Sequence, residues 1–258
     1  MNQGTIDLKD VSLVFGTGAQ SVVALESLSL HVNAGEFLAI LGPSGCGKSS
    51  LISTIAGFQA PRAGTLLVDG TVVDRPGSDR GVVFQQPTLF PWKSVRDNVD
   101  FGLRMRKVAW SKRQAILDEI LGKVGLSEFV HHYPTQLSGG MQQRVGLARV
   151  LVNQPSVMLM DEPFGSLDAQ TRLKMQELLL DVWSEFKMTI LFVTHDIDEA
   201  VFLGSRIAVL TRRPGRLKSI LDVELPRPRS EDVLVSPEFM RLKRNCMALL
   251  REETVGHA

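Results

Sequence analysis

The residues with the clearest chemical meaning form a glycine-rich segment that ends in a lysine and two serines: Gly42, Pro43, Ser44, Gly45, Cys46, Gly47, Lys48, Ser49 and Ser50. An apolar run over 36–41 precedes this segment, and a helix-like stretch over 50–56 follows it. That order of strand, loop and helix distinguishes a phosphate-binding loop from an ordinary glycine-rich turn. Glycines let successive backbone N–H groups point at one anion, and the helix N-terminus adds further donors. The segment therefore predicts a nucleoside triphosphate site, with Lys48 on the outer phosphates and the Ser49 hydroxyl on Mg²⁺.

A pair of carboxylates, Asp161 and Glu162, ends a second apolar run over 157–160. The carboxyl end of a buried strand lies at the crevice where α/β sheets bind ligands. Phosphoryl transfer mainly needs positioning and charge neutralisation. We therefore interpret Asp161 as a residue that holds Mg²⁺ through its water shell and Glu162 as the group that polarises the attacking water. The pair could also simply end a strand or cap a helix, but the upstream phosphate loop favours catalysis.

A third candidate is the turn Ser138, Gly139, Gly140 and Met141, which precedes a helix-like stretch over 142–149. A Ser-Gly-Gly turn at a helix start exposes N–H groups and a hydroxyl, which together form an anion site. Such a turn in isolation would be an ordinary capped helix. Its position between the phosphate loop and the carboxylate pair favours a second phosphate contact.

The elements that must position these residues show two kinds of sequence pattern. Residues 5–15 and 22–32 alternate as strands do, and 66–73 resembles a hairpin because Asp69-Gly70 favours a tight turn. These pieces indicate an antiparallel β layer. Short continuous apolar runs suit strands of a parallel sheet covered on both faces, and they lie at 81–84, 157–160, 190–193 and 207–210.

The region from about 87 to 155 is helical in pattern, with one apolar face formed by Ile116, Leu117, Ile120, Leu121 and Val124. A second apolar stripe, which we interpret as core packing, comprises Met175, Leu179, Val182 and Phe186. The expected fold is α/β with a mainly parallel core sheet, an antiparallel β subdomain and an inserted helical subdomain. The main domain would span 5–225. A tail over 226–258 would begin as an Arg-rich solvated linker and end in a helix from about Pro237 to Arg251.

Composition excludes several classes of protein. The chain has 258 residues, of which 44% are hydrophobic, so it can bury a large core. Its 29 basic and 28 acidic residues leave a net charge of +1, which offers no field for nucleic-acid binding. Two cysteines cannot form a disulfide framework and indicate a reducing compartment. No apolar run is long enough to cross a bilayer, and we see no leader segment, so we expect a cytosolic chain.

Taken together, the motifs resemble the ATP-binding subunits of ABC transporters, which have a P-loop NTPase fold, across most of the chain. Residues 42–49 match the Walker A loop, 138–141 resemble the signature and 157–162 match Walker B. The resemblance implies that Gln85 is the lid-loop glutamine that senses metal and water. It also implies that Asp168 belongs to the D-loop over 166–168, and that His195 is the switch histidine at the terminal phosphate.

Two positions depart from the usual pattern of that family. Met141 stands where glutamine is commoner, and Phe15 stands where a tyrosine usually stacks on adenine. A phenyl ring keeps the stacking face and loses the hydroxyl. Phe15 could also be a core residue.

The resemblance further implies a homodimer in which two copies stack head to tail. Each ATP would lie between the Walker A loop of one copy and the signature of the other, so that Ser138 and Gly140 act in trans. The other implied partners are integral membrane permease subunits and, indirectly, a periplasmic or surface solute-binding protein, with no nucleic acid. The chain would then be peripheral on the cytoplasmic face of the inner membrane.

The stretch after Gln85, which includes Phe90 and Trp92, resembles import-type subunits, where this region meets the membrane partner. These aromatic residues could be anchors for the permease or could pack the helical subdomain. Residues 75–85 and 212–216 resemble the group that serves nitrate, taurine and aliphatic sulfonates. The subunit never touches the solute, so this resemblance does not identify it. The alternatives are a soluble ABC-type ATPase not linked to transport and a metabolic P-loop kinase.

Overall fold

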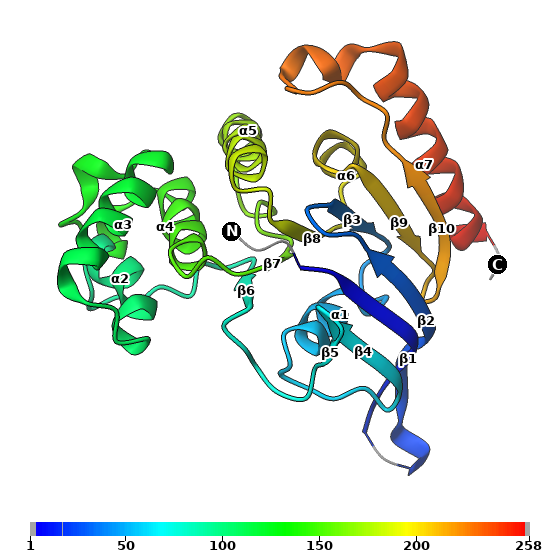
Figure 1. Cartoon of the computed structure of the whole chain (residues 1–258). Helices are drawn as coiled ribbons and strands as arrows, with labels where there is room; N and C mark the ends of the chain where they lie inside the picture. Colours follow the sequence, from blue (N-terminus) through cyan, green and yellow to red (C-terminus); the bar gives the residue numbers. More distant parts are fainter. Residues whose placement is uncertain (1–3, 17, 256–258) are drawn as a thin grey trace.

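The centre of the computed structural model, which describes residues 4–16 and 18–255, is a six-stranded sheet in the order β10-β9-β3-β8-β7-β6 (Figure 1). Its strands are β3 (Phe37–Leu41), β6 (Arg80–Val83), β7 (Val157–Asp161), β8 (Thr189–Thr194), β9 (Arg206–Leu210) and β10 (Leu217–Asp222). β10 pairs antiparallel with β9, and the other pairs are parallel. The prediction of a mainly parallel core sheet is confirmed.

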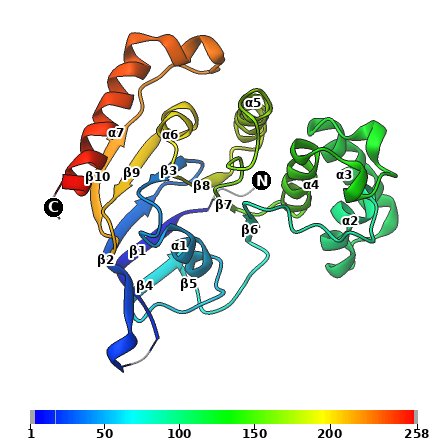
Figure 2. The same cartoon turned by 180° about the vertical axis from the view of Figure 1, so that it is seen from behind.

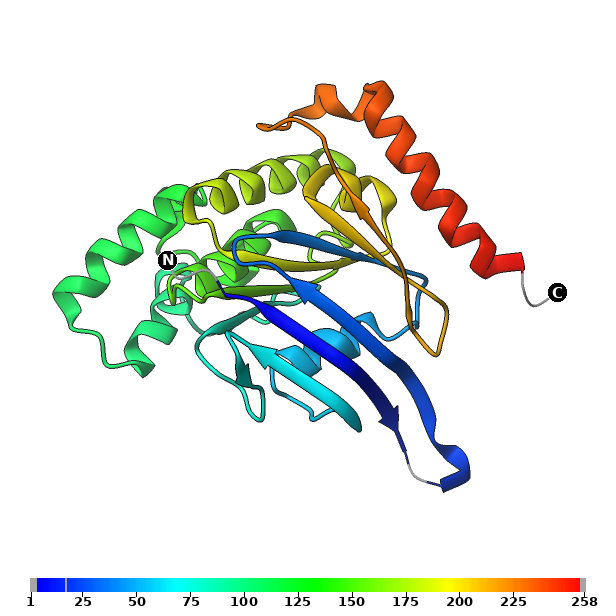
Figure 3. The ribbon, with the colours of Figure 1, turned by 45° about the vertical axis from the view of Figure 1, so that its right-hand side comes forward.

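A second sheet, with the order β2-β1-β4-β5, is antiparallel and forms the expected β layer (Figure 3). Its strands are β1 (Ile6–Phe15), β2 (Val22–Val32), β4 (Ala63–Val68) and β5 (Thr71–Val72). Asp69 and Gly70 have φ angles of 50° and 71°, as a primed turn requires, so the hairpin prediction is confirmed.

Both faces of the core sheet are covered, which explains its continuous apolar runs. Alternate residues such as Leu38, Ile40 and Leu159 face helix α1 (Lys48–Ile55), which lies between the two sheets (Figure 2). The intervening residues, such as Ala39 and Met160, face helices α5 (Ala169–Phe186) and α6 (Ile197–Leu203). The stripe of Met175, Leu179 and Val182 is buried in this cluster, and Phe186 packs against it, as predicted.

The helical region lies between β6 and β7 and projects from one edge of the core sheet (Figure 1). It contains α2 (Val95–Met105), α3 (Trp110–Lys123) and α4 (Gly139–Leu151), with short 3₁₀ turns at Ser127–Phe129 and Pro134–Gln136. Leu117, Ile120, Leu121 and Val124 are buried and Ile116 packs against them, as the apolar face predicts. No helix in the described ranges is long and apolar enough to cross a membrane.

The start of the tail is not a solvated linker, contrary to the sequence-based expectation. The Arg229 side chain is buried, and its Nη1 donates to the carbonyls of Val201, Phe202 and Gly204 at 3.2, 2.8 and 2.9 Å. These carbonyls lie at the C-terminal end of α6, where unpaired acceptors favour a cation. Burial lowers the pKa of Arg229 to about 9, which leaves it protonated at neutral pH. The guanidinium carbon of Arg227 lies 4.3 Å from the centroid of the Trp183 ring.

The rest of the tail forms a 3₁₀ turn (Glu231–Val235) and helix α7 (Pro237–Val255), which confirms the predicted final helix and extends it. Phe239, Leu242 and Cys246 of α7 are buried, and Lys243 forms an ion pair with Asp198 of α6 at 2.7 Å. Strand β10 was not predicted from the sequence, because half-exposed residues among Arg and Pro give no alternating pattern. The tail therefore covers the helix that follows β8.

Candidate functional site

The glycine-rich loop joins β3 to α1 and adopts backbone angles that require glycine. Gly45 and Gly47 have φ angles of 77° and 103°. A Cβ on Gly47 would lie 2.8 Å from the carbonyl oxygen of Ala24, so β2 excludes any larger residue there. No side chain caps the N-terminus of α1. The N–H groups of its first turn therefore remain available to an anion held by the loop.

The Lys48 ammonium group lies over its own loop. It donates to the carbonyl oxygens of Gly42 and Pro43 at 2.8 and 3.0 Å, and the residue is only 5% exposed. Its Nζ is 3.8 Å from Glu162 Oε1, which brings the Glu162 carboxylate and the cation of the loop into one cluster. A group with these contacts has the position and charge to meet the outer phosphates of a bound nucleotide.

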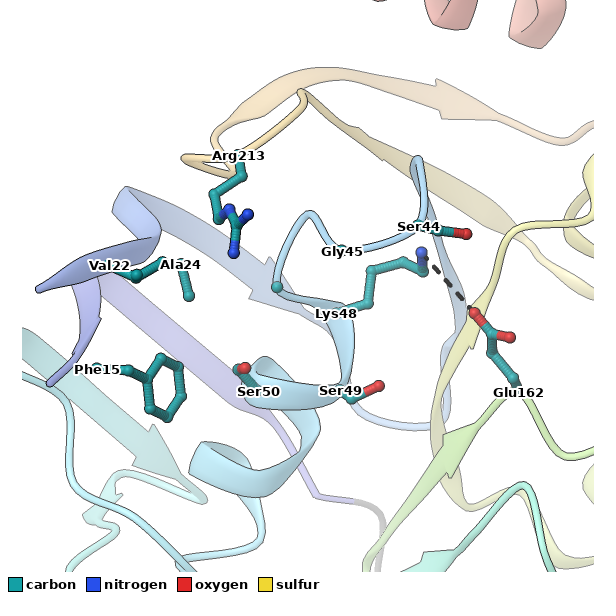
Figure 4. A pocket seen from close by; sticks show the side chains of 11 residues that line it. Phe15, Val22, Ala24, Ser44, Gly45, Lys48, Ser49, Ser50, Glu162 and Arg213 are labelled. Carbon is teal, nitrogen blue, oxygen red and sulfur yellow. Dashed lines mark ion pairs between the residues drawn. The ribbon is translucent and has the colours of Figure 1, made fainter. Parts of the chain in front are cut away.

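A cavity of about 280 Å³ opens beside the loop (Figure 4). Its lining residues are Phe15, Val22, Ala24, Ser44, Gly45, Gly47, Lys48, Ser49, Ser50, Glu162 and Arg213. Phe15 is 42% exposed, so it is not a core residue. One end of the cavity carries the Phe15 ring with Val22 and Ala24, whereas the other end carries the backbone donors of the loop and Lys48, an arrangement that suits a nucleotide. The Cys46 side chain is buried in the core, so only its backbone can face a ligand.

Two hard oxygen donors meet where the loop passes the end of β7. The Ser49 hydroxyl donates to Asp161 Oδ1 at 3.0 Å. Desolvation raises the pKa of Asp161, and the hydrogen bond from Ser49 opposes that shift. A hydroxyl and a carboxylate suit Mg²⁺, which takes few protein ligands and completes its shell with water and phosphate oxygens. Ser49 and Asp161 are thus close enough to share one cation.

Glu162 has an unusual backbone, with a φ angle of 44° in the left-handed region. Its N–H still bonds to the carbonyl of Val193 at 2.9 Å, so the residue continues the pairing of β7 with β8 while its side chain turns toward the loop. Such a conformation costs about 1–3 kcal/mol, and strain of this kind concentrates at functional sites. Glu162 Oε2 is 2.9 Å from His195 Nδ1, which joins the residue after β8 to the same cluster.

The predicted residues of the signature, the D-loop and the lid loop do not line this cavity within their own chain. Ser138 caps α4 by accepting from the Met141 N–H at 3.3 Å, and a Cβ on Gly140 would lie 2.6 Å from the Thr171 methyl. Asp168 caps α5, and this hydrogen bond from the Thr171 N–H lowers the pKa of Asp168. Among the described residues that line the cavity, none belongs to 138–141 or to the positions of Gln85 and Asp168.

Sequence reasoning missed two residues at this site. Gln143 is 2% exposed, and its Nε2 donates to the carbonyls of Gln85 and Pro163 at 2.8 and 2.6 Å. It therefore connects α4 both to Gln85 and to the segment after Glu162. Arg213 lines the cavity from the turn after β9. A buried amide on a helix is a weak signal for Gln143, and nothing local to Arg213 reveals its place.

Comparison with known proteins agrees with this geometry. A family model described as "ABC transporter" matches residues 25–165. The chain is 44% identical to a nitrate import ATP-binding protein of Synechocystis sp., over 95% of both chains. It is 45% identical to a taurine import ATP-binding protein of Rhizobium johnstonii, over 90% of each chain. It is also 43% identical to an aliphatic sulfonates import ATP-binding protein of Bacillus licheniformis, over 90% of this chain and 89% of that protein.

A solved structure matches the fold with a TM-score of 0.75 and 32% identity, covering 86% of this chain and 100% of that chain. It is a dimeric structure of an ATP-binding cassette in a post-hydrolysis state, bound to ADP and Pi.

Proposed function

The chain belongs to the ABC transporter family, and from this premise we propose that it hydrolyses ATP to energise a bacterial importer of nitrate, taurine, aliphatic sulfonate or a similar small solute. The observation that carries the proposal is the cluster of Lys48, Glu162 and His195 beside the phosphate loop. We retain 5–225 as the ATPase domain, with the helical subdomain at about 87–155 and the tail at 226–258.

Each residue of the site has its own role in the proposed phosphoryl transfer. The loop from Gly42 to Ser50 and the Lys48 ammonium hold the phosphates, while the Phe15 ring stacks on the base. Glu162 orients the attacking water and takes its proton. His195, with Nδ1 at 2.9 Å from Glu162 Oε2, orients that carboxylate and reaches the terminal phosphate. Mg²⁺ would neutralise phosphate charge when bound, held by Ser49, Asp161 and Gln85.

We further propose that the signature residues Ser138, Gly139, Gly140 and Met141 complete the site of a second copy in trans, with Asp168 at the same interface. Their absence from the cavity lining of their own chain supports this arrangement. The dimeric form of the ADP-bound cassette of similar fold supports it as well. Ser138 would present its hydroxyl and the N–H groups of the α4 N-terminus to the γ-phosphate of the partner's ATP.

Ser138→Glu should prevent ATP-dependent dimerisation and leave ATP binding by the monomer unchanged. A carboxylate next to a γ-phosphate costs several kcal/mol, so we expect the dimer dissociation constant to rise by about 100-fold or more. Analytical ultracentrifugation with ATP in a Glu162→Gln background measures the dimer, and calorimetry measures the monomer's affinity. Ser184→Glu, on the exposed side of α5, is the control. Weaker ATP binding by the Ser138→Glu monomer would instead place Ser138 in its own chain's site.

Of the large aromatic side chains that the described part of the helical subdomain exposes, that of Trp92 is the most exposed. Trp92 is 71% exposed. Phe90 is half-buried and packs on Phe101, with ring centroids 4.8 Å apart, and on the Arg149 guanidinium at 5.0 Å. Phe90 therefore supports the segment, whereas the Trp92 side chain is available to a partner. Exposed tryptophans are enriched among residues that dominate binding energy. We propose Trp92 as an anchor for the permease at the cytoplasmic face of the membrane.

Trp92→Ala should weaken assembly with the permease by about 30-fold or more, because loss of a binding hot spot costs about 2 kcal/mol or more. ATP turnover of the isolated subunit should stay unchanged. Affinity for the detergent-solubilised permease and solute-stimulated turnover of the complex measure the effect, and the stimulating solute identifies the cargo. Trp110→Ala, which removes a 62% exposed tryptophan from α3, is the matched control. Normal assembly of Trp92→Ala would exclude the anchor role.

A further inference from the structure

The turn between β9 and β10 lies directly against the phosphate loop and β2. Gly215 donates its N–H to the carbonyl of Ala24 at 2.9 Å and accepts from the Glu26 N–H at 3.0 Å. A Cβ on Gly215 would lie 2.2 Å from the carbonyl oxygen of Cys46, which belongs to the loop. The approach is therefore possible only because this residue is glycine. The turn is built into the wall of the nucleotide cavity.

Internal hydrogen bonds hold this turn in one shape. The Thr211 N–H donates to the carbonyl of Arg216 at 3.0 Å, and the Arg216 N–H donates back to the Thr211 hydroxyl oxygen at 2.9 Å. The Arg216 guanidinium pairs with Glu26 of β2 at 2.7 Å. These contacts fix the backbone conformation of the turn, including the residue at its tip, without any ligand.

Arg213 stands at that tip, and its side chain points into the cavity (Figure 4). The figure places it on the same side of the loop as Val22, Ala24 and Phe15, whereas the Lys48 ammonium lies toward Glu162. No residue in the described part of the chain forms a hydrogen bond or an ion pair with the Arg213 guanidinium. A charged group presented in this way is available to whatever fills the cavity.

We propose that Arg213 is a nucleotide-binding residue that contacts the base and ribose half of ATP from the wall formed by the β9–β10 turn. The inference rests on the proposed function, since it takes the ligand to be a nucleotide. A guanidinium is planar, stacks on aromatic faces and offers several donors to hydroxyl groups, so it suits an adenine ring and a ribose. Phe15 at the same end of the cavity supplies an aromatic ring on which the base can also stack.

The test compares ligands that share different parts of ATP, using the full chain. Arg213→Ala should raise the dissociation constants of ATP and ADP by the same factor, about 10-fold, since stacking of a cation on a ring has this order of effect. It should leave the inhibition constant of inorganic triphosphate unchanged. Arg213→Lys should recover only part of the loss, because an ammonium lacks the planar face. Calorimetry gives the nucleotide constants, and inhibition of ATP hydrolysis gives the triphosphate constant.

Arg212→Ala, which alters the neighbouring exposed arginine outside the cavity lining, is the matched control and should bind like the unmodified chain. An unchanged unfolding temperature without ligand shows that Arg213→Ala keeps the fold. Two results would overturn the proposal: unchanged ATP and ADP affinity in Arg213→Ala, or equal weakening of inorganic triphosphate. Failure of the unmodified chain to bind ATP would instead reject the proposed function itself.

Discussion

Glu162→Gln is expected to bind ATP with nearly unchanged affinity and to hydrolyse it about 10²- to 10⁴-fold more slowly, the range that a positioned general base contributes. The amide keeps the size of the side chain but cannot take a proton from water. The backbone of Glu162, at a φ of 44°, aims the side chain at the loop independently of its charge. Phosphate release gives the turnover, and size-exclusion chromatography with ATP should show accumulated dimer.

Glu231→Gln, on the exposed 3₁₀ turn before α7, removes a carboxylate far from the cluster in sequence and should leave turnover unchanged. Near-normal turnover of Glu162→Gln would refute its role as the base. Slow turnover together with lost ATP affinity would point to a binding defect instead, because a residue that acts on the attacking water contributes little to nucleotide affinity.

Lys48→Met should weaken ATP binding by about 100-fold or more and abolish turnover at physiological nucleotide levels. Methionine preserves the length of the apolar stem but removes the charge that would bridge the outer phosphates, and loss of a charge-assisted contact in a closed site costs about 2–5 kcal/mol. The variant also removes the donors to Gly42 and Pro43, so a small drop in unfolding temperature should accompany it. Calorimetry with ATP and AMP measures the effect.

AMP lacks the outer phosphates and should bind Lys48→Met and the unmodified chain alike. Equal weakening of both nucleotides would mean that the substitution has disturbed the whole loop. Lys218→Met serves as the control, because it removes a lysine that pairs with Glu252 on α7 and lies outside the cavity lining.

The parts of the site that sequence reasoning anticipated are those with local causes. A loop position that needs a positive φ, such as that of Gly47, is occupied by glycine, and the glycine can be recognised in the sequence of the loop. A strand covered on both faces, such as β8, leaves a continuous apolar run. The same holds for the Asp69-Gly70 hairpin turn and for the carboxylates at the end of β7. Spacing along the chain is enough to recognise such features, because a few neighbouring residues determine them.

Other features depend on partners distant in sequence, so no local pattern could reveal them. The sequence pattern around Arg229 predicted a solvated linker, yet the Arg229 side chain is buried because the C-terminal carbonyls of α6 lie beside it. Arg213 reaches the cavity because Gly215 lets its turn approach Ala24 and Cys46.

The amino-acid sequence by itself therefore determined the phosphate loop, the carboxylate pair and the alternation of strands and helices, since backbone freedom and side-chain periodicity are short-range properties. Tertiary structure alone decided that Glu162 meets both His195 and Lys48 and that Ser138 lies outside its own chain's cavity. It also decided that Arg229 of the tail is buried against α6 and that Arg213 of the β9–β10 turn lines the cavity. Such contacts depend on which surfaces pack together, and packing is a property of the whole chain.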